Sequence, residues 1–141
     1  MDIAQRTAEL SHARRLKVGS IIVKEDRIIS IGYNGMPAGW DNNCEHELHQ
    51  PVGRVDLVTK PEVLHAETNA IAKLARSSDS GLDADIFITH APCLDCAKLI
   101  YQSGIRRVYF GQAYRDTSGI EFLKNSDIKV EQINEQCDSN Y

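Results

Sequence analysis

Residues 86–110, IFITHAPCLDCAKLIYQSGIRRVYF, hold a strand, a helix and a second strand in direct succession, and this order decides the fold. Residues 86–89 and 107–110 are short and apolar, as buried strands are. Residues 93–103 between them have helical spacing, and Gly104 stands where a glycine commonly ends a helix. A helical crossover returns the chain parallel to the strand that it left. The sequence therefore predicts a sheet with parallel strands at this end.

The remaining elements extend this sheet in both directions. Residues 18–24 (VGSIIVK) and 27–33 (RIISIGY) flank a short turn and predict an antiparallel hairpin. Helices are expected at 2–15, 65–76 and 118–124, and a last strand is expected at 128–133. We expect a three-layer α/β/α fold: a five-stranded mixed sheet that opens with an antiparallel hairpin, has strands four and five parallel and carries helices on both faces. Residues 34–62 show little periodicity, and a loop of that length is usually functional or disordered.

Length and composition narrow the class of protein. The chain has 141 residues, and we expect one domain over 1–141 with a frayed polar tail at 134–141. A net charge of −4 argues against a nucleic-acid partner. There is no run of eighteen apolar residues for a membrane span and no signal-peptide pattern, so a cytoplasmic protein is expected. In that reducing compartment the four cysteines are interpreted as metal ligands or free thiols.

Two short motifs carry the chemistry, and each begins a predicted helix. They are His65-Ala66-Glu67 and Pro92-Cys93-Leu94-Asp95-Cys96. Two cysteines three residues apart lie on one face of a helix, where its N-terminus favours negative charge. One histidine and two cysteines make three zinc ligands, which leaves a fourth position for water, as in a catalytic site. Taken singly, a Cys-x-x-Cys is also typical of redox pairs and structural zinc sites, but no second Cys-x-x-Cys exists to complete a zinc ribbon.

Glu67 is the candidate proton carrier. It stands two residues after His65, so on a helix it does not point in the same direction and is not an obvious fourth ligand. It can still reach a water on the metal, where a proton shuttle has to lie.

These motifs resemble those of the zinc-dependent nucleoside and nucleotide deaminases. Three stretches are similar to the deoxycytidylate (dCMP) deaminases, especially viral ones: 32–37 (GYNGMP), 65–71 (HAETNAI) and 93–98 (CLDCAK). The resemblance implies the cytidine deaminase-like fold and hydrolysis of dCMP to dUMP and ammonia by a zinc-activated water, with Glu67 moving the protons. Alternatives are a deaminase of free cytidine, of a tRNA adenosine or of a pterin or purine base, and a non-catalytic zinc-bound nucleotide sensor.

The resemblance also implies residues that bind the substrate. Asn34 resembles the family's sugar-contacting asparagine, although Asn-Gly is also a turn signal. The small side chain of Ala66 lets its backbone N–H approach the cytosine carbonyl. Tyr114 and Arg115 resemble a pair that closes on the nucleotide phosphate, and they follow a strand at its carboxyl end, where open sheets bind ligands. Weaker phosphate candidates are Ser11, Arg14 and Lys17.

The loop at 35–43 (GMPAGWDNN) resembles the segment that binds a regulatory triphosphate between subunits in regulated dCMP deaminases. The implied pattern is activation by dCTP and inhibition by dTTP, with Mg²⁺ on the triphosphate, in a homo-oligomer that is commonly a hexamer. The candidate allosteric residues are Gly35, Met36, Pro37, Gly39, Trp40, Asp41 and Asn43.

Three further features remain open in the sequence. Some viral relatives carry a second zinc, and Cys44, His46 and His49 are the residues available here, but they do not match that site position by position. His90 is expected near the site, either touching the base or sugar or packed at a strand end. Cys137 is expected to be a bystander in the tail.

Overall fold

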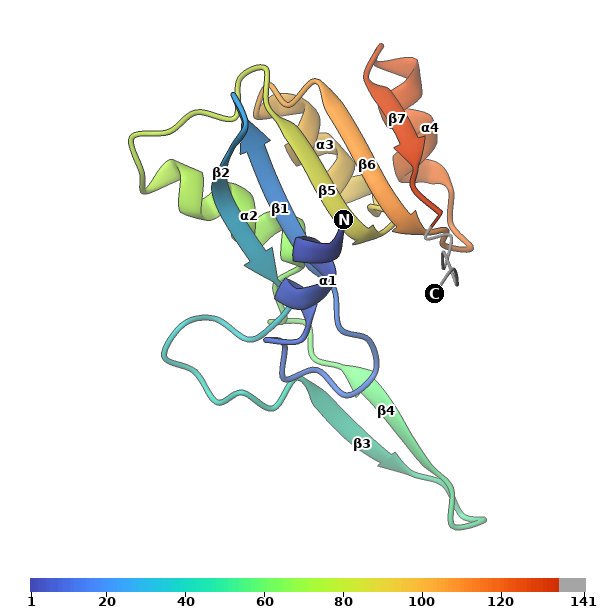
Figure 1. Ribbon diagram of the computed structural model, residues 1–141. Helices are drawn as coiled ribbons and strands as arrows, with labels where there is room; N and C mark the ends of the chain where they lie inside the picture. The colour runs from blue at the N-terminus through green and yellow to red at the C-terminus, as the bar shows by residue number, and fades with distance from the viewer. Residues whose placement is uncertain (135–141) are drawn as a thin grey trace, which may run out of the picture.

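The protein is built on a five-stranded sheet with the order β2-β1-β5-β6-β7 (Figure 1). The computed structural model describes residues 1–134. The strands of this sheet are β1 (Gly19–Lys24), β2 (Arg27–Tyr33), β5 (Asp85–His90), β6 (Arg107–Gln112) and β7 (Lys129–Gln132). β1 pairs antiparallel with β2 and with β5, whereas β5–β6 and β6–β7 are parallel. The predicted mixed sheet, its opening hairpin and its parallel strands are therefore confirmed.

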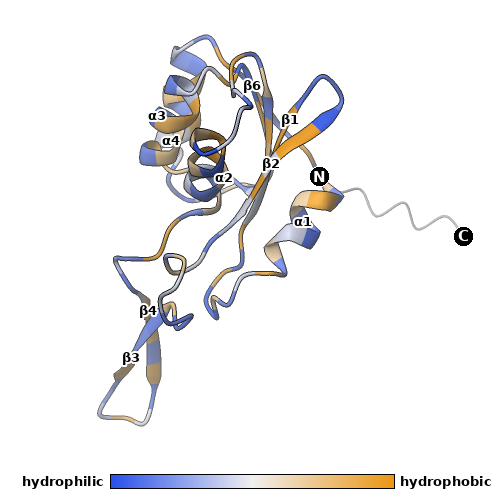
Figure 2. Cartoon of the chain, turned by 90° about the vertical axis from the view of Figure 1, so that its left-hand side faces the viewer, coloured by the Kyte–Doolittle hydropathy of each residue, from blue (hydrophilic) through white to orange (hydrophobic). Residues whose placement is uncertain are grey.

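Helices cover both faces of the sheet, which confirms the predicted layers. They are α1 (Asp2–Ala8), α2 (Ala66–Ala75), α3 (Leu94–Gln102) and α4 (Ser118–Asn125). α2, α3 and α4 lie on one face, and α1 lies on the other, against β1, β2 and β5 (Figure 2). None of these four helices, within residues 1–134, is long and apolar enough to cross a membrane.

The core lies between the sheet and the three helices on its first face. Its fully buried side chains are led by Ile22, Ile86, Ile88, Ile100, Val108 and Leu123. Gly32 of β2 allows α2 to approach, because a Cβ there would meet the carbonyl oxygen of Ala66 and the backbone nitrogen of Ala70. This contact fixes the start of α2, where His65 stands.

The prediction of a loop throughout 34–62 is wrong. β3 (Glu45–His49) and β4 (Val55–Thr59) form an antiparallel hairpin that projects away from the main sheet (Figure 1). Its first strand reads EHELH, and most side chains of both strands are exposed, so no apolar alternation marks it in the sequence. Backbone pairing and exposed ion pairs such as Arg54–Asp56, 2.7 Å, take the place of a buried face.

The predicted helix 2–15 also needs correction, since α1 ends at Ala8. Side chains take the backbone donors that a longer helix would use. The Ser11 hydroxyl accepts from the N–H of Ala13, and the Glu45 carboxylate accepts from the N–H groups of Arg14 and Arg15. Residues 9–18 therefore run as an irregular segment beside the hairpin.

The predicted tail at 134–141 and Cys137 lie outside the described residues, except for residue 134.

Candidate active site

Two helix N-termini bring the three predicted metal ligands together. His65 is the N-cap residue of α2, and Cys93 is the N-cap residue of α3. His65 Nδ1 lies 3.6 Å from Cys93 Sγ and 3.3 Å from Cys96 Sγ. One ligand atom from each residue falls within 4.8 Å of the other two. The donors converge on one point, as three ligands of one ion must.

The charges at this point suit a cation. Hydrogen bonds from Cys96 and from His65 lower the pKa of the Cys93 thiol to about 4, and the same contact with Cys93 raises the pKa of Cys96. The hydrogen bond to Cys93 raises the pKa of His65. A thiolate is thus favoured at Cys93, and the Cys96 thiol would give up its proton to ligate a metal. One imidazole and two thiolates are ligands that zinc prefers.

Glu67 is a buried residue beside these ligands. It is on the first turn of α2, its side chain lines the cavity, and only 4% of the residue is exposed. Burial raises its pKa to about 7. A carboxyl group with that pKa takes up and releases a proton at neutral pH, as general acid–base work requires.

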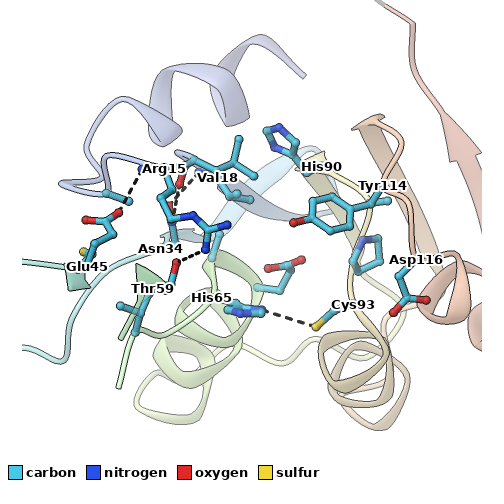
Figure 3. Close-up of a pocket in the computed structure, with 18 residues that line it drawn as sticks. Arg15, Val18, Asn34, Glu45, Thr59, His65, His90, Cys93, Tyr114 and Asp116 are labelled. Atoms are coloured by element: carbon cyan, nitrogen blue, oxygen red, sulfur yellow. Dashed lines mark hydrogen bonds between the residues drawn. The ribbon is translucent and has the colours of Figure 1, made fainter. Parts of the chain in front are cut away.

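A cavity of about 450 Å³ opens in front of Glu67. Its volume falls in the usual range for small-molecule sites. Its lining residues come from six parts of the chain, which lie within 13–18, 34, 44–45, 59–67, 90–93 and 114–116. In Figure 3, Tyr114 points its hydroxyl into this space from one side, and Arg15 directs its guanidinium from the opposite side.

The predicted sugar and base contacts both line the cavity. Ala66 is fully buried in the first turn of α2. Asn34 is already engaged, since its Oδ1 accepts from the N–H of Val18 (2.9 Å) and its Nδ2 donates to the carbonyl of Leu16 (2.8 Å). An amide side chain has four hydrogen-bonding positions, so two remain for a ligand.

The predicted phosphate residues are divided by the structure. Tyr114 lines the cavity with 56% of its surface exposed, and Asp116 lines it as well. Arg115 stands between them, is exposed, and is not among the lining residues. The cation that does line the cavity is Arg15.

The weaker phosphate candidates also lie outside the cavity lining. Ser11 is buried and donates to the carbonyl of Asn34 (2.7 Å). Arg14 pairs with Glu47 at 3.0 Å, and Lys17 is exposed. Sequence reasoning missed Arg15 although it stands among these residues, because an irregular segment has no period that tells which side chain points inward.

The predicted allosteric loop is a surface loop that leaves the cavity at Asn34 and returns to it at Cys44. Trp40 is 57% exposed, and Gly39 adopts a positive φ of 84°. The Gly35 amide donates to the carbonyl of Leu64 (3.1 Å), so that amide is not free for a phosphate. Hydrogen bonds within the loop join the Asn43 amide to Asp41 (2.7 Å) and the Trp40 amide to the carbonyl of Pro37 (3.0 Å).

The structure does not bring Cys44, His46 and His49 together. Among residues 1–134 the three-ligand grouping found is that of His65, Cys93 and Cys96. Cys44 is buried, whereas His46 and His49 are exposed and fall on opposite faces of β3.

His90 lines the cavity at the end of β5, half-buried. Its Nδ1 lies 2.9 Å from the hydroxyl of Thr89, and burial lowers its pKa. It is thus both a packed strand-end residue and part of the cavity wall.

Comparison with known proteins gives a consistent result. Residues 1–112 match the family described as the cytidine and deoxycytidylate deaminase zinc-binding region. The chain is 33% identical over 165 residues to the deoxycytidylate deaminase of Enterobacteria phage T4, covering 92% of this chain and 86% of that protein. It is 36% identical over 116 residues to the deoxycytidylate deaminase of Mycobacterium phage D29, covering 78% and 89%.

A solved structure is similar over nearly the same span. It is the dCMP deaminase of cyanophage S-TIM5 in complex with dCMP and dUMP, which is 41% identical with a TM-score of 0.83 and covers 94% of this chain and 92% of that one.

Proposed function

The chain belongs to the cytidine and deoxycytidylate deaminase zinc-binding family, and from this we propose that it hydrolyses dCMP to dUMP and ammonia. It is a zinc-dependent deaminase. The observation that carries the choice of substrate is the presence of the Arg15 guanidinium in the same cavity as Glu67 and the three ligands. Such a cavity suits a nucleoside monophosphate, because the base can lie against Glu67 while the phosphate lies against the Arg15 guanidinium. We also propose that residues 1–141 form one deaminase domain.

Zinc would be held by His65, Cys93 and Cys96, whose donors converge as described. When bound, it supplies a Lewis acid that lowers the pKa of a coordinated water to about 7. α2 and α3 hold the donors in place, because each ligand lies at a helix N-terminus that is packed on the same sheet face.

Glu67 moves the protons of the reaction. Its carboxylate takes a proton from water as the oxygen adds to C4 of the cytosine, and gives that proton to N3. It then takes the proton of the new C4 hydroxyl and gives it to the amino group, so that the C4–N bond breaks, the C4 carbonyl forms and ammonia leaves. Water supplies the C4 oxygen, the hydrogen on N3 and the third hydrogen of ammonia, so the atoms balance. Proton transfer by a positioned group contributes roughly 10²–10⁴ in rate.

The rest of the cavity orients the nucleotide. The Ala66 N–H, which lies at the first helical position of α2, would donate to the C2 carbonyl of the base. Asn34 would contact the sugar through its two remaining hydrogen-bonding positions. Arg15 and Tyr114 would meet the phosphate, and Arg115 would join them if the segment after β6 closes on the ligand.

The test compares dCMP with deoxycytidine, which differ by the phosphate alone. Arg15→Ala is expected to lower kcat/KM for dCMP by roughly 10- to 100-fold and to change that for deoxycytidine little, because a charge-assisted contact is lost. Arg115→Ala, assayed in parallel, tells whether the second arginine shares the role. An equal loss on both substrates would show that Arg15 does not bind the phosphate.

Ammonia release from cytidine, dCMP, dCTP and adenosine decides among the substrates of the family. Turnover of adenosine or cytidine above that of dCMP would contradict the proposal. No turnover of any of them by the zinc-loaded protein would favour a nucleotide sensor.

We further propose that dCTP activates and dTTP inhibits the enzyme, each with Mg²⁺, in a homo-oligomer that is expected to be a hexamer. The support is the loop 35–43, which is exposed at Trp40 and begins at Asn34 in the cavity wall. Each effector must bind the active and inactive states with different affinity. Light scattering, followed by dCMP assays with each triphosphate, tests this, and an unresponsive monomer would contradict regulation while leaving catalysis in place.

A further inference from the structure

A buried carboxylate stands at the base of the hairpin, in the wall of the same cavity but apart from the metal ligands (Figure 3). Glu45 is the first residue of β3 and is 2% exposed. Its Oε1 accepts from the N–H of Arg14 (2.8 Å) and from the N–H of Arg15 (3.2 Å). Its Oε2 lies 3.6 Å from Arg14 Nε and has no hydrogen-bond partner. A buried charge is costly unless it is paired, so these contacts specify where the segment 14–15 lies.

The opposite strand of the hairpin, β4, binds the guanidinium of Arg15. Thr59 is the cross-strand partner of Glu45. Its hydroxyl accepts from Arg15 Nη1 at 3.1 Å. One pair of residues in β3 and β4 therefore fixes Arg15 twice, at its backbone and at its guanidinium, as the dashed lines of Figure 3 show.

This arrangement prepares the side chain for a ligand. A free arginine loses considerable rotamer freedom when it is immobilised on a phosphate, and that loss weakens binding. An arginine already held in the cavity wall loses less. The remaining guanidinium N–H groups, which Thr59 does not occupy, stay available.

We propose that Glu45, together with Thr59, is a positioning residue that sets the preference of the enzyme for a phosphorylated substrate by holding Arg15. This inference rests on the proposed contact between Arg15 and the phosphate. Glu45 takes no part in the chemistry at the base. It acts through Arg15, so its removal should weaken substrate binding and leave the chemical step unchanged.

Two variants and one control test the proposal. Glu45→Gln keeps the size of the side chain but removes its charge, and Thr59→Val removes the exposed hydroxyl that holds the guanidinium. Each is expected to raise KM for dCMP roughly five- to tenfold, because a hydrogen bond to a charged group is replaced by a weaker one or lost. The value of kcat, and kcat/KM for deoxycytidine, should stay within about twofold.

Glu47→Gln is the matched control. Glu47 lies two residues along the same strand and face, and pairs with Arg14 at 3.0 Å, but it is exposed and makes no hydrogen bond to Arg15. It should leave both substrates unaffected. The double variant Arg15→Ala/Glu45→Gln should be no worse on dCMP than Arg15→Ala alone, because both changes act on one contact.

The outcomes separate the two proposals. If Arg15→Ala lowers the preference for dCMP while Glu45→Gln and Thr59→Val do not, the positioning role is wrong and the phosphate contact stands. Equal losses on both substrates in Glu45→Gln, with a lowered melting temperature, would show that Glu45 is structural only. Thr59→Val decides the matter if Glu45→Gln does not fold. If Arg15→Ala leaves the preference intact, the phosphate contact is wrong and the positioning role fails with it.

Discussion

Replacing Glu67 with glutamine isolates the proton transfer from everything else in the site. Glutamine keeps the shape of the side chain and one oxygen acceptor, but it cannot take up a proton. The three metal ligands are other residues, so zinc content should stay at one per chain. We expect Glu67→Gln to bind dCMP and zinc and to lose nearly all turnover.

The size of the loss follows from the role. General acid–base catalysis contributes roughly 10²–10⁴ in rate, which corresponds to about 3–5 kcal/mol of activation free energy. The fold should not suffer, because Glu67 is 4% exposed and its burial disfavours the charged form, as its pKa of about 7 shows. A neutral isostere removes that cost, so the melting temperature should stay or rise.

Ammonia release, zinc analysis and a melting curve on the same sample check this prediction. Asp95→Asn is the matched control, since Asp95 lies in the first turn of α3 beside the ligands but 88% of its side chain is exposed, next to Lys98. It should retain normal turnover. A Glu67→Gln enzyme that keeps its zinc and retains more than about a tenth of normal turnover would refute the assigned role.

Three further predictions concern the metal, the sheet and the core. Cys96→Ser should lose zinc and turnover together, and a chelator should inactivate the normal enzyme until zinc is restored, as metal analysis with parallel assays would show. Gly32→Val should destabilise the protein and weaken zinc binding, because its side chain would meet the Ala66 carbonyl; thermal unfolding would register this. Ile100→Ala, at a fully buried position, should cost about 2–5 kcal/mol of unfolding free energy. Leu99→Ala, at a neighbouring position that is 44% exposed, should cost less than about 1 kcal/mol in the same denaturant titration.

The sequence predicts the grouping of the three metal ligands because local spacing determines it. Cys93 and Cys96 share a face as soon as residues 93–103 are a helix, and His65 begins the other helix. Both helices carry apolar positions at helical spacing, and β1, β2, β5 and β6 carry short apolar runs. The ligand cluster then follows from the way parallel strands and their crossover helices stack.

The substrate end is less predictable because it depends on contacts between distant segments. The hairpin of β3 and β4 is mostly exposed and has no apolar alternation, so its strands are not visible in the sequence. The end of α1 at Ala8 depends in part on Glu45, which stands 31 residues from Arg14. Nor could spacing show that Arg15, and not Arg14, faces the cavity.

The metal-ligand end and the substrate end of the site have different parts in distinguishing substrates. The ligands and Glu67 suit the deamination of any amino-substituted heterocycle that reaches them, so they do not by themselves choose dCMP over cytidine or adenosine. We propose that the choice comes from residues that would meet the sugar and the phosphate, namely Asn34, Arg15 and Tyr114, which line the cavity. One arginine in the cavity suits one phosphate group, whereas a tRNA would require basic residues spread over the surface, and the net charge of −4 does not provide an excess of them. Because Arg15 is held by the hairpin and Asn34 by residues 16–18, we expect changes in these segments to alter the substrate preference without altering the catalytic residues.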